Sequence, residues 1–183
     1  MTVRAFNSSK FQILFAVVLV LLFSGVSCVS VSLGGSKTEK AKGVAFATPN
    51  GNFKEIKNDG ADFAWNSGST GSTIAYQSTC GDTPDARLES IAQDLFGGFE
   101  QSKELRDERI PFDGREALSR DVEGKVDGVV TRVRAIIYKK NKCTYILTFV
   151  ALDKTQVADS GRKAAINGDV AEFEKFAASF KAP

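Results

Sequence analysis

The side chains of this chain that could do chemistry are few, because its 183 residues include no histidine. A Ser-His-Asp or Cys-His triad is therefore excluded. A serine–lysine pair is formally open, and Ser119 with Lys125 or Lys139 would form it. Both residue types are common, however, so their presence alone carries little weight. No GxxxxGKS/T or GxGxxG motif marks a phosphate-binding loop. We therefore expect a protein that is not an enzyme.

Acidic residues near glycines raise the question of a metal site in the segment DVEGKVDG, residues 121–128. Asp121, Glu123 and Asp127 could hold calcium, but their spacing does not match an EF-hand loop. A solvated hairpin turn accounts for the same residues. A two-cysteine metal site is disfavoured as well, because the chain lacks both histidine and a CxxC pair. The sequence predicts no bound metal and no cofactor.

The N-terminal stretch predicts export. Arg4 and Lys10 precede an apolar run, residues 11–23, which is followed by the small residues SGVS and by Cys28. A helix of that length spans about 20 Å, whereas the hydrocarbon core of a bilayer is about 30 Å thick. The run is too short for a comfortable permanent span and suits a cleaved signal peptide, residues 1–27.

The end of this stretch resembles a bacterial lipobox. Val26, Ser27 and Cys28 fit that pattern, whereas Gly25 stands where a leucine or another aliphatic residue is usual. The resemblance implies cleavage before Cys28, a diacylglyceryl group on its thiol and acylation, typically palmitate, of its amino group. Two or more chains anchor a protein firmly. Val29, in place of an aspartate, favours the outer membrane, facing the periplasm. Ordinary cleavage to a soluble secreted protein and an uncleaved helical anchor remain alternatives.

Two further cysteines, Cys80 and Cys143, remain if Cys28 carries lipid. In an oxidising periplasm an even pair indicates a disulfide. The two cysteines are 143 − 80 = 63 residues apart. Closing a loop of that length stabilises the folded state by about 4 kcal/mol in the chain-entropy model. Two independent buried thiols are the alternative.

The remaining composition predicts one ordinary domain. Of the 24 Lys and Arg residues, two fall in the signal segment, whereas all 22 Asp and Glu residues lie beyond it. The mature chain is therefore formally neutral, which argues against nucleic acid as a partner. A content of 43% hydrophobic residues, with 14 Phe, is ample for a core. We expect a flexible tether over residues 28–42 and a single α/β domain over residues 43–183.

Hydrophobic periodicity and turn residues predict the elements of this domain. The expected strands are an apolar run at 43–49 answered across Asn50-Gly51 by 53–56, then 61–65, 72–79, 103–111, 115–122, 129–139 and 143–152. Expected turns lie at 66–71, 124–128 and 141–142, and the strand 103–111 is expected at an edge. Expected helices are 83–99, capped by Thr83, then 153–165 and 169–180, with Asp169 and Glu172 as a capping box.

The element order resembles the PsbP-like fold. The segments FATPNGNFKEI, REALSRDVEGKVDGVVTRVRAIIYKKNKCTYILTFVA and FEKFAASFK carry the likeness. A Ran-binding nuclear import factor and many bacterial lipoproteins share this fold. The resemblance implies an α+β fold, with an antiparallel β-sheet flanked by helices in an α/β/α sandwich, and a non-enzymatic accessory or binding protein. The histidines that some plant members use for binding have no counterpart here, so no site carries over.

Three residues are candidates for contact with a partner. Arg132 and Arg134 lie in a basic part of the meander, where cross-strand ion pairs compete with a face for an anionic glycan, a lipid head group or an acidic protein. Trp65, beside a Gly/Ser loop, is either a contact residue or part of the core. We expect a membrane-anchored envelope lipoprotein with a protein partner. A soluble periplasmic ligand-binding module and, less favoured, a hydrolase are alternatives.

Overall fold

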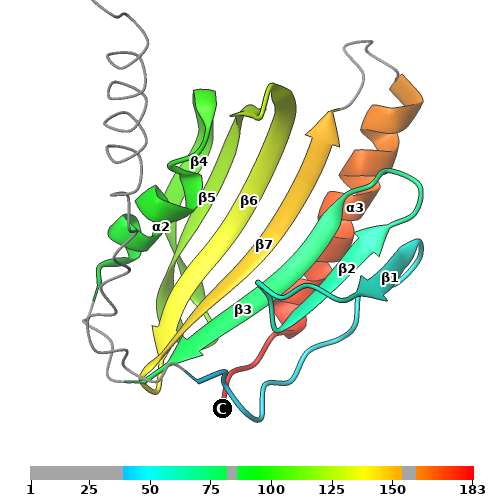
Figure 1. The fold of residues 1–183 in the computed structure, drawn as a ribbon. Coiled ribbons are helices and arrows are strands. Elements are labelled where there is room, and N and C mark those ends of the chain that lie inside the picture. Colours follow the sequence, from blue (N-terminus) through cyan, green and yellow to red (C-terminus); the bar gives the residue numbers. More distant parts are fainter. Residues whose placement is uncertain (1–38, 82–85, 154–159) are drawn as a thin grey trace, which may run out of the picture. The chain divides into compact units, whose positions relative to one another are not determined.

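Seven antiparallel strands form one sheet in the computed structural model, which describes residues 39–81, 86–153 and 160–183 (Figure 1). The strands are β1 (Phe53–Ile56), β2 (Phe63–Ser67), β3 (Thr73–Cys80), β4 (Glu100–Phe112), β5 (Arg115–Val126), β6 (Val129–Lys140) and β7 (Cys143–Asp153). Their order in the sheet is β1-β2-β3-β7-β6-β5-β4. The helices are α2 (Leu88–Phe96) and α3 (Ser160–Ser179). The predicted edge position of the strand at 103–111 is confirmed, because β4 is the last strand.

Two-residue turns join the long strands β4 to β7. Asp127 and Gly128 both have positive φ, at 50° and 76°, the conformation of the tight hairpin turns that match strand twist. The predicted turn at 124–128 is therefore too long, and β5 continues to Val126. Gly124 lies within β5, where a Cβ atom would come within 2.9 Å of the Phe99 ring. This glycine serves close packing and not the turn.

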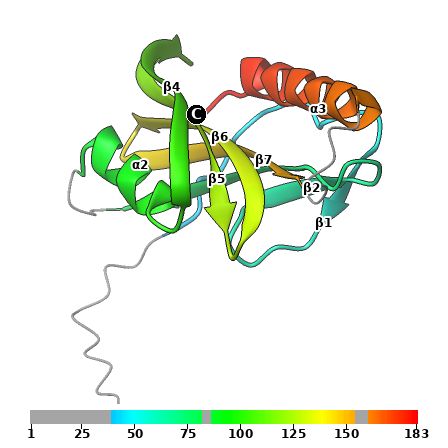
Figure 2. The ribbon, with the colours of Figure 1, turned by 90° about the horizontal axis from the view of Figure 1, so that it is seen from above.

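Side chains alternate between two covered faces of the sheet. On one face, Phe173 and Phe176 of α3 pack on a large aromatic core that includes Tyr145 and Phe149. On the other face, Ala92 of α2 packs on a smaller cluster of residues from β5, β6 and β7, namely Leu118, Ala135, Ile137 and Ile146. Figure 2 shows α3 lying along one side of the sheet. The predicted α+β class, an antiparallel sheet between helices, is confirmed.

The C-terminal helix departs from the prediction. We expected two helices separated near Gly168, but α3 is continuous from Ser160 to Ser179. Asp169 is not a cap, because it lies inside the helix, is 8% exposed and accepts a hydrogen bond from Thr70 in the β2–β3 loop. Glu172 instead accepts from the backbone N–H of Asn50 at 3.3 Å. These tertiary contacts outweigh the local signal for a break.

Two other local predictions are wrong, one in where a helix begins and one in which segments pair. The helix expected from residue 83 begins at Leu88, and Arg87 precedes it with an extended backbone and no side-chain cap. The proposed cap, Thr83, lies outside the described residues. The apolar run at 43–49 is not a strand paired with 53–56, because β1 pairs with β2. Ala45 of that run instead exchanges two backbone hydrogen bonds with Lys181, at 2.9 and 2.8 Å.

The last residues of the expected tether are bound to the domain. Glu39 exchanges two backbone hydrogen bonds with Cys80 at the end of β3, at 3.1 and 2.8 Å. Lys40 lies 3.2 Å from the Asp62 carboxylate, and the Ala41 N–H donates to the Ser78 hydroxyl at 2.8 Å. These contacts join residues 39–41 to the domain, and the boundary at residue 42 stays a prediction. Residues 28–38 of the expected tether lie outside the described part of the chain.

Candidate functional site

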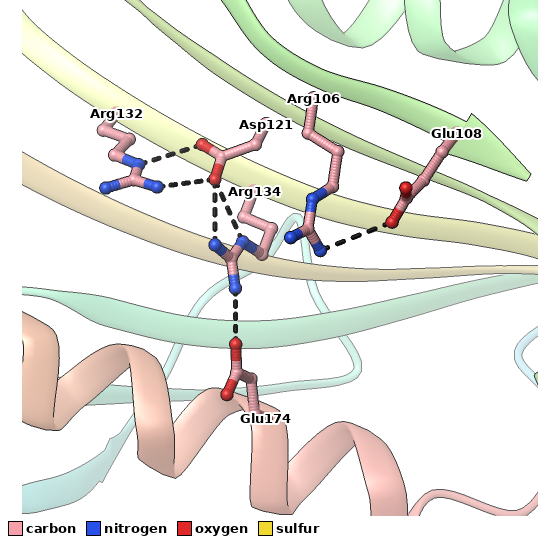
Figure 3. A network of polar contacts seen from close by, with 6 residues as sticks. All are labelled: Arg106, Glu108, Asp121, Arg132, Arg134 and Glu174. Atoms are coloured by element: carbon pink, nitrogen blue, oxygen red, sulfur yellow. Dashed lines mark hydrogen bonds and ion pairs between the residues drawn. The ribbon is translucent and has the colours of Figure 1, made fainter. Parts of the chain in front are cut away.

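A cluster of charged side chains surrounds one buried carboxylate, Asp121 of β5, on the face of the sheet beside α3 (Figure 3). The Arg132 guanidinium group makes a bidentate contact with the Asp121 carboxylate, with Nε 2.9 Å from Oδ1 and Nη2 2.7 Å from Oδ2. Arg134 donates to Oδ2 from Nε and Nη2, at 3.1 and 3.0 Å. Its Nη1 reaches Glu174 of α3 at 2.8 Å. We call these four residues the Asp121 cluster.

Strand register builds the Asp121 cluster. Asp121 lies directly opposite Arg134 in the antiparallel pair of β5 and β6, and Glu123 lies opposite Arg132. Residues two apart on a strand share a face, so both guanidinium groups of β6 project to the side of Asp121. The sequence thus places two forked cations around one acceptor, a geometry in which arginine is favoured over lysine.

Electrostatics keep this cluster ionised. Burial by itself raises the pKa of Asp121, but hydrogen bonds and positive charge from Arg132 and Arg134 more than offset it, so its pKa lies below the usual aspartate value. The hydrogen bond to Asp121 raises the pKa of Arg132 in turn. A carboxylate held charged in this way is poorly suited to exchange protons near neutral pH. The cluster therefore holds its charges in fixed positions.

The predicted cross-strand ion pairs are present. Arg132 and Arg134 of β6 pair with Asp121 of β5. Arg106 Nη1 lies 3.4 Å from Glu108 Oε1 in a further pair within β4, and both side chains are about half exposed. On the opposite face, Arg120 makes a forked contact with Asp107, at 3.0 and 2.7 Å. Partner contact remains a prediction for Arg132 and Arg134, whose side chains are 33% and 12% exposed.

The cysteines and Trp65 are the other residues that the sequence singled out. Cys80 and Cys143 form the predicted disulfide, with an S–S distance of 2.02 Å, between facing residues of β3 and β7. Trp65 is 2% exposed and packs against Phe46 and Phe176, so the core alternative holds and a surface contact by its ring is not available. Cys28 lies outside the described residues.

The serine–lysine candidates are not brought together. Ser119 is 3% exposed and faces Ile136. Lys125 lies six positions further along the same strand, and the Lys139 ammonium group donates to the carbonyl oxygen of Ala86. Among the described residues, no three or more acidic, cysteine or histidine side chains are grouped to hold a metal ion. Within the same part of the chain, no helix has the length and apolar character needed to cross a membrane.

A second buried carboxylate was not foreseen. Asp113, in the β4–β5 turn, accepts from Lys140 Nζ at 3.0 Å and from the Ala182 N–H at 2.9 Å, and it lies 3.4 Å from the Tyr138 hydroxyl. Burial raises the pKa of Asp113. The hydrogen bond from the Ala182 N–H and the hydrogen bond and charge of Lys140 together lower it by more, so the pKa of Asp113 lies below the usual aspartate value. Burial and the Asp113 charge raise the pKa of Tyr138. Asp113 thereby ties the residues after α3 to the sheet.

Asp113 and Asp121 are the polar residues that sequence reasoning missed. Their signal was present only in part. The sequence shows arginines facing several acidic residues across the meander, but nothing in it identifies which carboxylate is buried. The Asp-Gly pair at 113–114 indicates a tight turn, but not that the turn would reach the end of the chain.

No protein-family model matches the chain, and no curated protein matches it in sequence. Solved structures share its α/β/α architecture. LpqN of Mycobacterium tuberculosis, described as involved in cell envelope biogenesis, has a TM-score of 0.55 at 10% identity, over 82% of this chain and 88% of LpqN. A protein from Bacteroides thetaiotaomicron VPI-5482 has a TM-score of 0.50 at 10% identity, over 76% of this chain. The chain spans only 45% of that protein's length.

The structural neighbours also include a PsbP. Cyanobacterial PsbP (CyanoP) from Synechocystis sp. PCC 6803 has a TM-score of 0.49 at 14% identity, over 86% of this chain and 98% of that protein. At 10% identity, the likeness to LpqN shows a shared fold alone.

Proposed function

We propose that this protein is a lipoprotein of the bacterial cell envelope. Acyl chains on Cys28 hold one α+β domain at the membrane, in the outer membrane facing the periplasm. The domain acts by contact with another envelope component, as an accessory or assembly factor, and carries out no reaction of its own.

The disulfide between Cys80 and Cys143 is the observation that carries this proposal. Disulfides persist in oxidising compartments such as the periplasm and are rare in the bacterial cytosol, so the bond supports export. It also occupies two of the three cysteines of the chain. Cys28, at the end of the apolar N-terminal run, is then the one thiol left for acylation.

The distribution of buried and exposed charged side chains supports a function in contact with a partner. The carboxylates of Asp121 and Asp113 are buried in ion pairs, whereas the charged side chains of β4 are exposed over most of its length. Charges along an edge strand oppose unspecific pairing with other sheets. A partner with complementary charge remains able to bind Arg132 and Arg106, whose guanidinium groups reach solvent. LpqN, which shares the fold, is described as involved in cell envelope biogenesis.

Metabolic labelling with an alkyne fatty acid tests the anchor. We expect the parent protein to be labelled and to remain with membranes after a high-salt wash, and we expect Cys28→Ala to lose both properties. The double variant Cys80→Ala/Cys143→Ala is the matched control, because it removes the other two cysteines and should keep the label. A parent that carries no fatty acid, or a Cys28→Ala variant that keeps it, would refute the proposal.

The absence of catalysis has a separate test. Ser119, the serine considered for a serine–lysine pair, is 3% exposed. We expect the purified protein to be inert toward a broad fluorophosphonate probe for activated serines. Labelling that is lost in Ser119→Ala would show that the hydrolase alternative is correct.

A further inference from the structure

The two ends of the sheet carry opposite charge, although the mature chain is formally neutral. We use the name tether end for the end at which β3 and β6 finish and β5 and β7 begin. Its described segments are 39–42, 56–62, 86–87, 112–116, 139–142 and 180–183. The far end, at which β4 and β6 begin, comprises 50–55, the β2–β3 loop at 67–72, 94–100, 123–129, 153 and the first part of α3, residues 160–172.

The tether end has an excess of basic residues. Nine lysine and arginine residues stand there against five acidic ones: Lys40, Lys42, Lys57, Arg87, Arg115, Lys139, Lys140, Lys142 and Lys181, against Glu39, Asp59, Asp62, Asp113 and Glu116. Residues 82–85, which include Asp82 and Asp85, lie outside the described part of the chain and are not counted. Three of these acids have cationic partners: Asp62 pairs with Lys40, Asp113 pairs with Lys140 and Lys181, and Glu116 pairs with Arg109 from outside the tether end. The excess of four basic residues already includes these pairs.

The far end is acidic. Eight carboxylates stand there against four cations: Glu55, Asp94, Glu100, Glu123, Asp127, Asp153, Asp169 and Glu172, against Lys54, Lys125, Arg162 and Lys163. Residues 154–159, which include Lys154 and Asp159, lie outside the described part of the chain and are not counted. The domain therefore has a positive and a negative pole along the direction of its strands.

The anchor joins the positive pole. Glu39 exchanges backbone hydrogen bonds with Cys80 at the tether end, and at the same end the Asn141 side chain of the β6–β7 turn donates to the Pro183 carbonyl oxygen at 2.6 Å. Only residues 29–38 separate Glu39 from Cys28. Ten residues of random coil span about 18 Å on average. The tether therefore keeps the basic end of the domain within a short distance of the lipid surface.

We infer that the domain docks on the membrane that holds its anchor, with the tether end against the head groups of anionic phospholipids. The inference rests on the proposed lipid on Cys28. Lys40 and Lys181, whose side chains are 65% and 62% exposed, contact the head groups together with Lys42. A negative lipid surface attracts basic residues within about one screening length. The same surface repels the acidic far end when that end approaches it, so the charges of both ends favour the orientation with the tether end toward the lipid. The Asp121 cluster, between the poles, stays open to the periplasm.

Thiol labelling in vesicles tests this orientation on the lipidated full chain. The protein is purified from membranes in detergent and reconstituted into vesicles of phosphatidylcholine, with or without phosphatidylglycerol. Pro183→Cys places a thiol at the tether end, and Ser69→Cys places one at the far end; both positions are exposed and neither change alters a charge. We expect maleimide labelling of Pro183→Cys to slow about tenfold with phosphatidylglycerol at low salt. Labelling of Ser69→Cys should not change.

Salt and charge reversal identify the cause of the protection. In 1 M salt the screening length falls to about 3 Å, so the protection of Pro183→Cys should be lost. Lys42→Glu/Lys181→Glu should remove it at low salt as well. Lys54→Glu/Lys125→Glu, which makes the same change of charge at the far end, should leave it intact. Equal labelling of both sites, or protection insensitive to salt and to Lys42→Glu/Lys181→Glu, would overturn the docking.

Failure of the anchor has a different signature. Cys80 and Cys143 are oxidised and a lipidated Cys28 has no free thiol, so the parent chain should take up no maleimide. A labelled parent would show a free Cys28 and would overturn the proposed anchor, and the docking with it. A silent parent with an unprotected Pro183→Cys would overturn the docking alone.

Discussion

The half of the sheet beneath α3 and the half that ends at β4 are stabilised in different ways. Beneath α3, aromatic rings exclude water: Phe176 packs against Trp65 and Phe180, with ring centroids 5.5 and 5.9 Å apart. Toward β4, the same face is held by ion pairs around Asp121. Ring packing depends little on pH or salt, whereas the second half depends on one ionised carboxylate. The stability of the β4 half should therefore respond to pH and salt, and that of the half beneath α3 should not.

Removing a ring from the aromatic half should have the largest effect. Phe176 is 1% exposed, and Phe176→Ala is expected to lower the free energy of unfolding by about 3–5 kcal/mol, because it leaves a cavity in a packed core. Urea unfolding followed by the fluorescence of Trp65, the only tryptophan, measures the change. Phe63→Ala is the matched control, since Phe63 belongs to the same cluster but is 41% exposed. Equal losses in the two variants would contradict the role assigned to the buried rings.

Neutralising the hub of the charged half should have an intermediate effect. Asp121→Asn keeps the shape of the side chain but leaves Arg134, which is 12% exposed, and Arg132 without their shared counter-charge. We expect a loss of about 2–3 kcal/mol in the free energy of unfolding, since an unpaired buried charge is costly. The same urea titration measures it. Asp107→Asn is the control, because Asp107 also pairs with an arginine but is 30% exposed, and its loss should stay below about 1 kcal/mol. A neutral effect of Asp121→Asn would show that the cluster contributes nothing to stability.

The charged half is also the part of the fold that the sequence predicts best. Alternation and short turn signals give β5, β6 and β7 within a few residues, because period-two patterning leaves little choice of register between strands joined by two-residue turns. The aromatic half was predicted less well. Gly168 indicates a break, yet α3 runs through it, because contacts from Asp169 to the β2–β3 loop and from Phe173 to Phe149 of β7 hold the helix. Local propensity cannot anticipate such contacts.

The site shows the opposite pattern. The pairing of Cys80 with Cys143 follows from the compartment and from counting cysteines, without any knowledge of register. The burial of Asp121 does not, because several carboxylates lie in the same meander and only the pairing of β5 with β6 selects the one between two arginines. For Trp65, beside a Gly/Ser loop, the sequence leaves a contact residue and the core as alternatives, and only the structure shows that its ring packs against Phe176 of α3. Burial of a polar or aromatic residue depends on the whole sheet and not on its neighbours in the chain.

The smallest expected effect sharpens the comparison by its dependence on pH. The pKa of Asp121 is lowered in the folded protein, so its ion pairs contribute stability above the unfolded value of about 3.9 and lose it as the pH falls through the folded pKa. The gap in unfolding free energy between the parent and Asp121→Asn should therefore shrink progressively below about pH 4. Asp113, whose pKa is lowered too, titrates in both proteins and cancels in the difference. The gap between the parent and Phe176→Ala should stay constant over the same range, because no titrating group is removed. Urea titrations at pH 7 and pH 3 measure both gaps, and an Asp121→Asn gap that does not change with pH would mean that shape and hydrogen bonding, rather than ionised pairs, stabilise the β4 half.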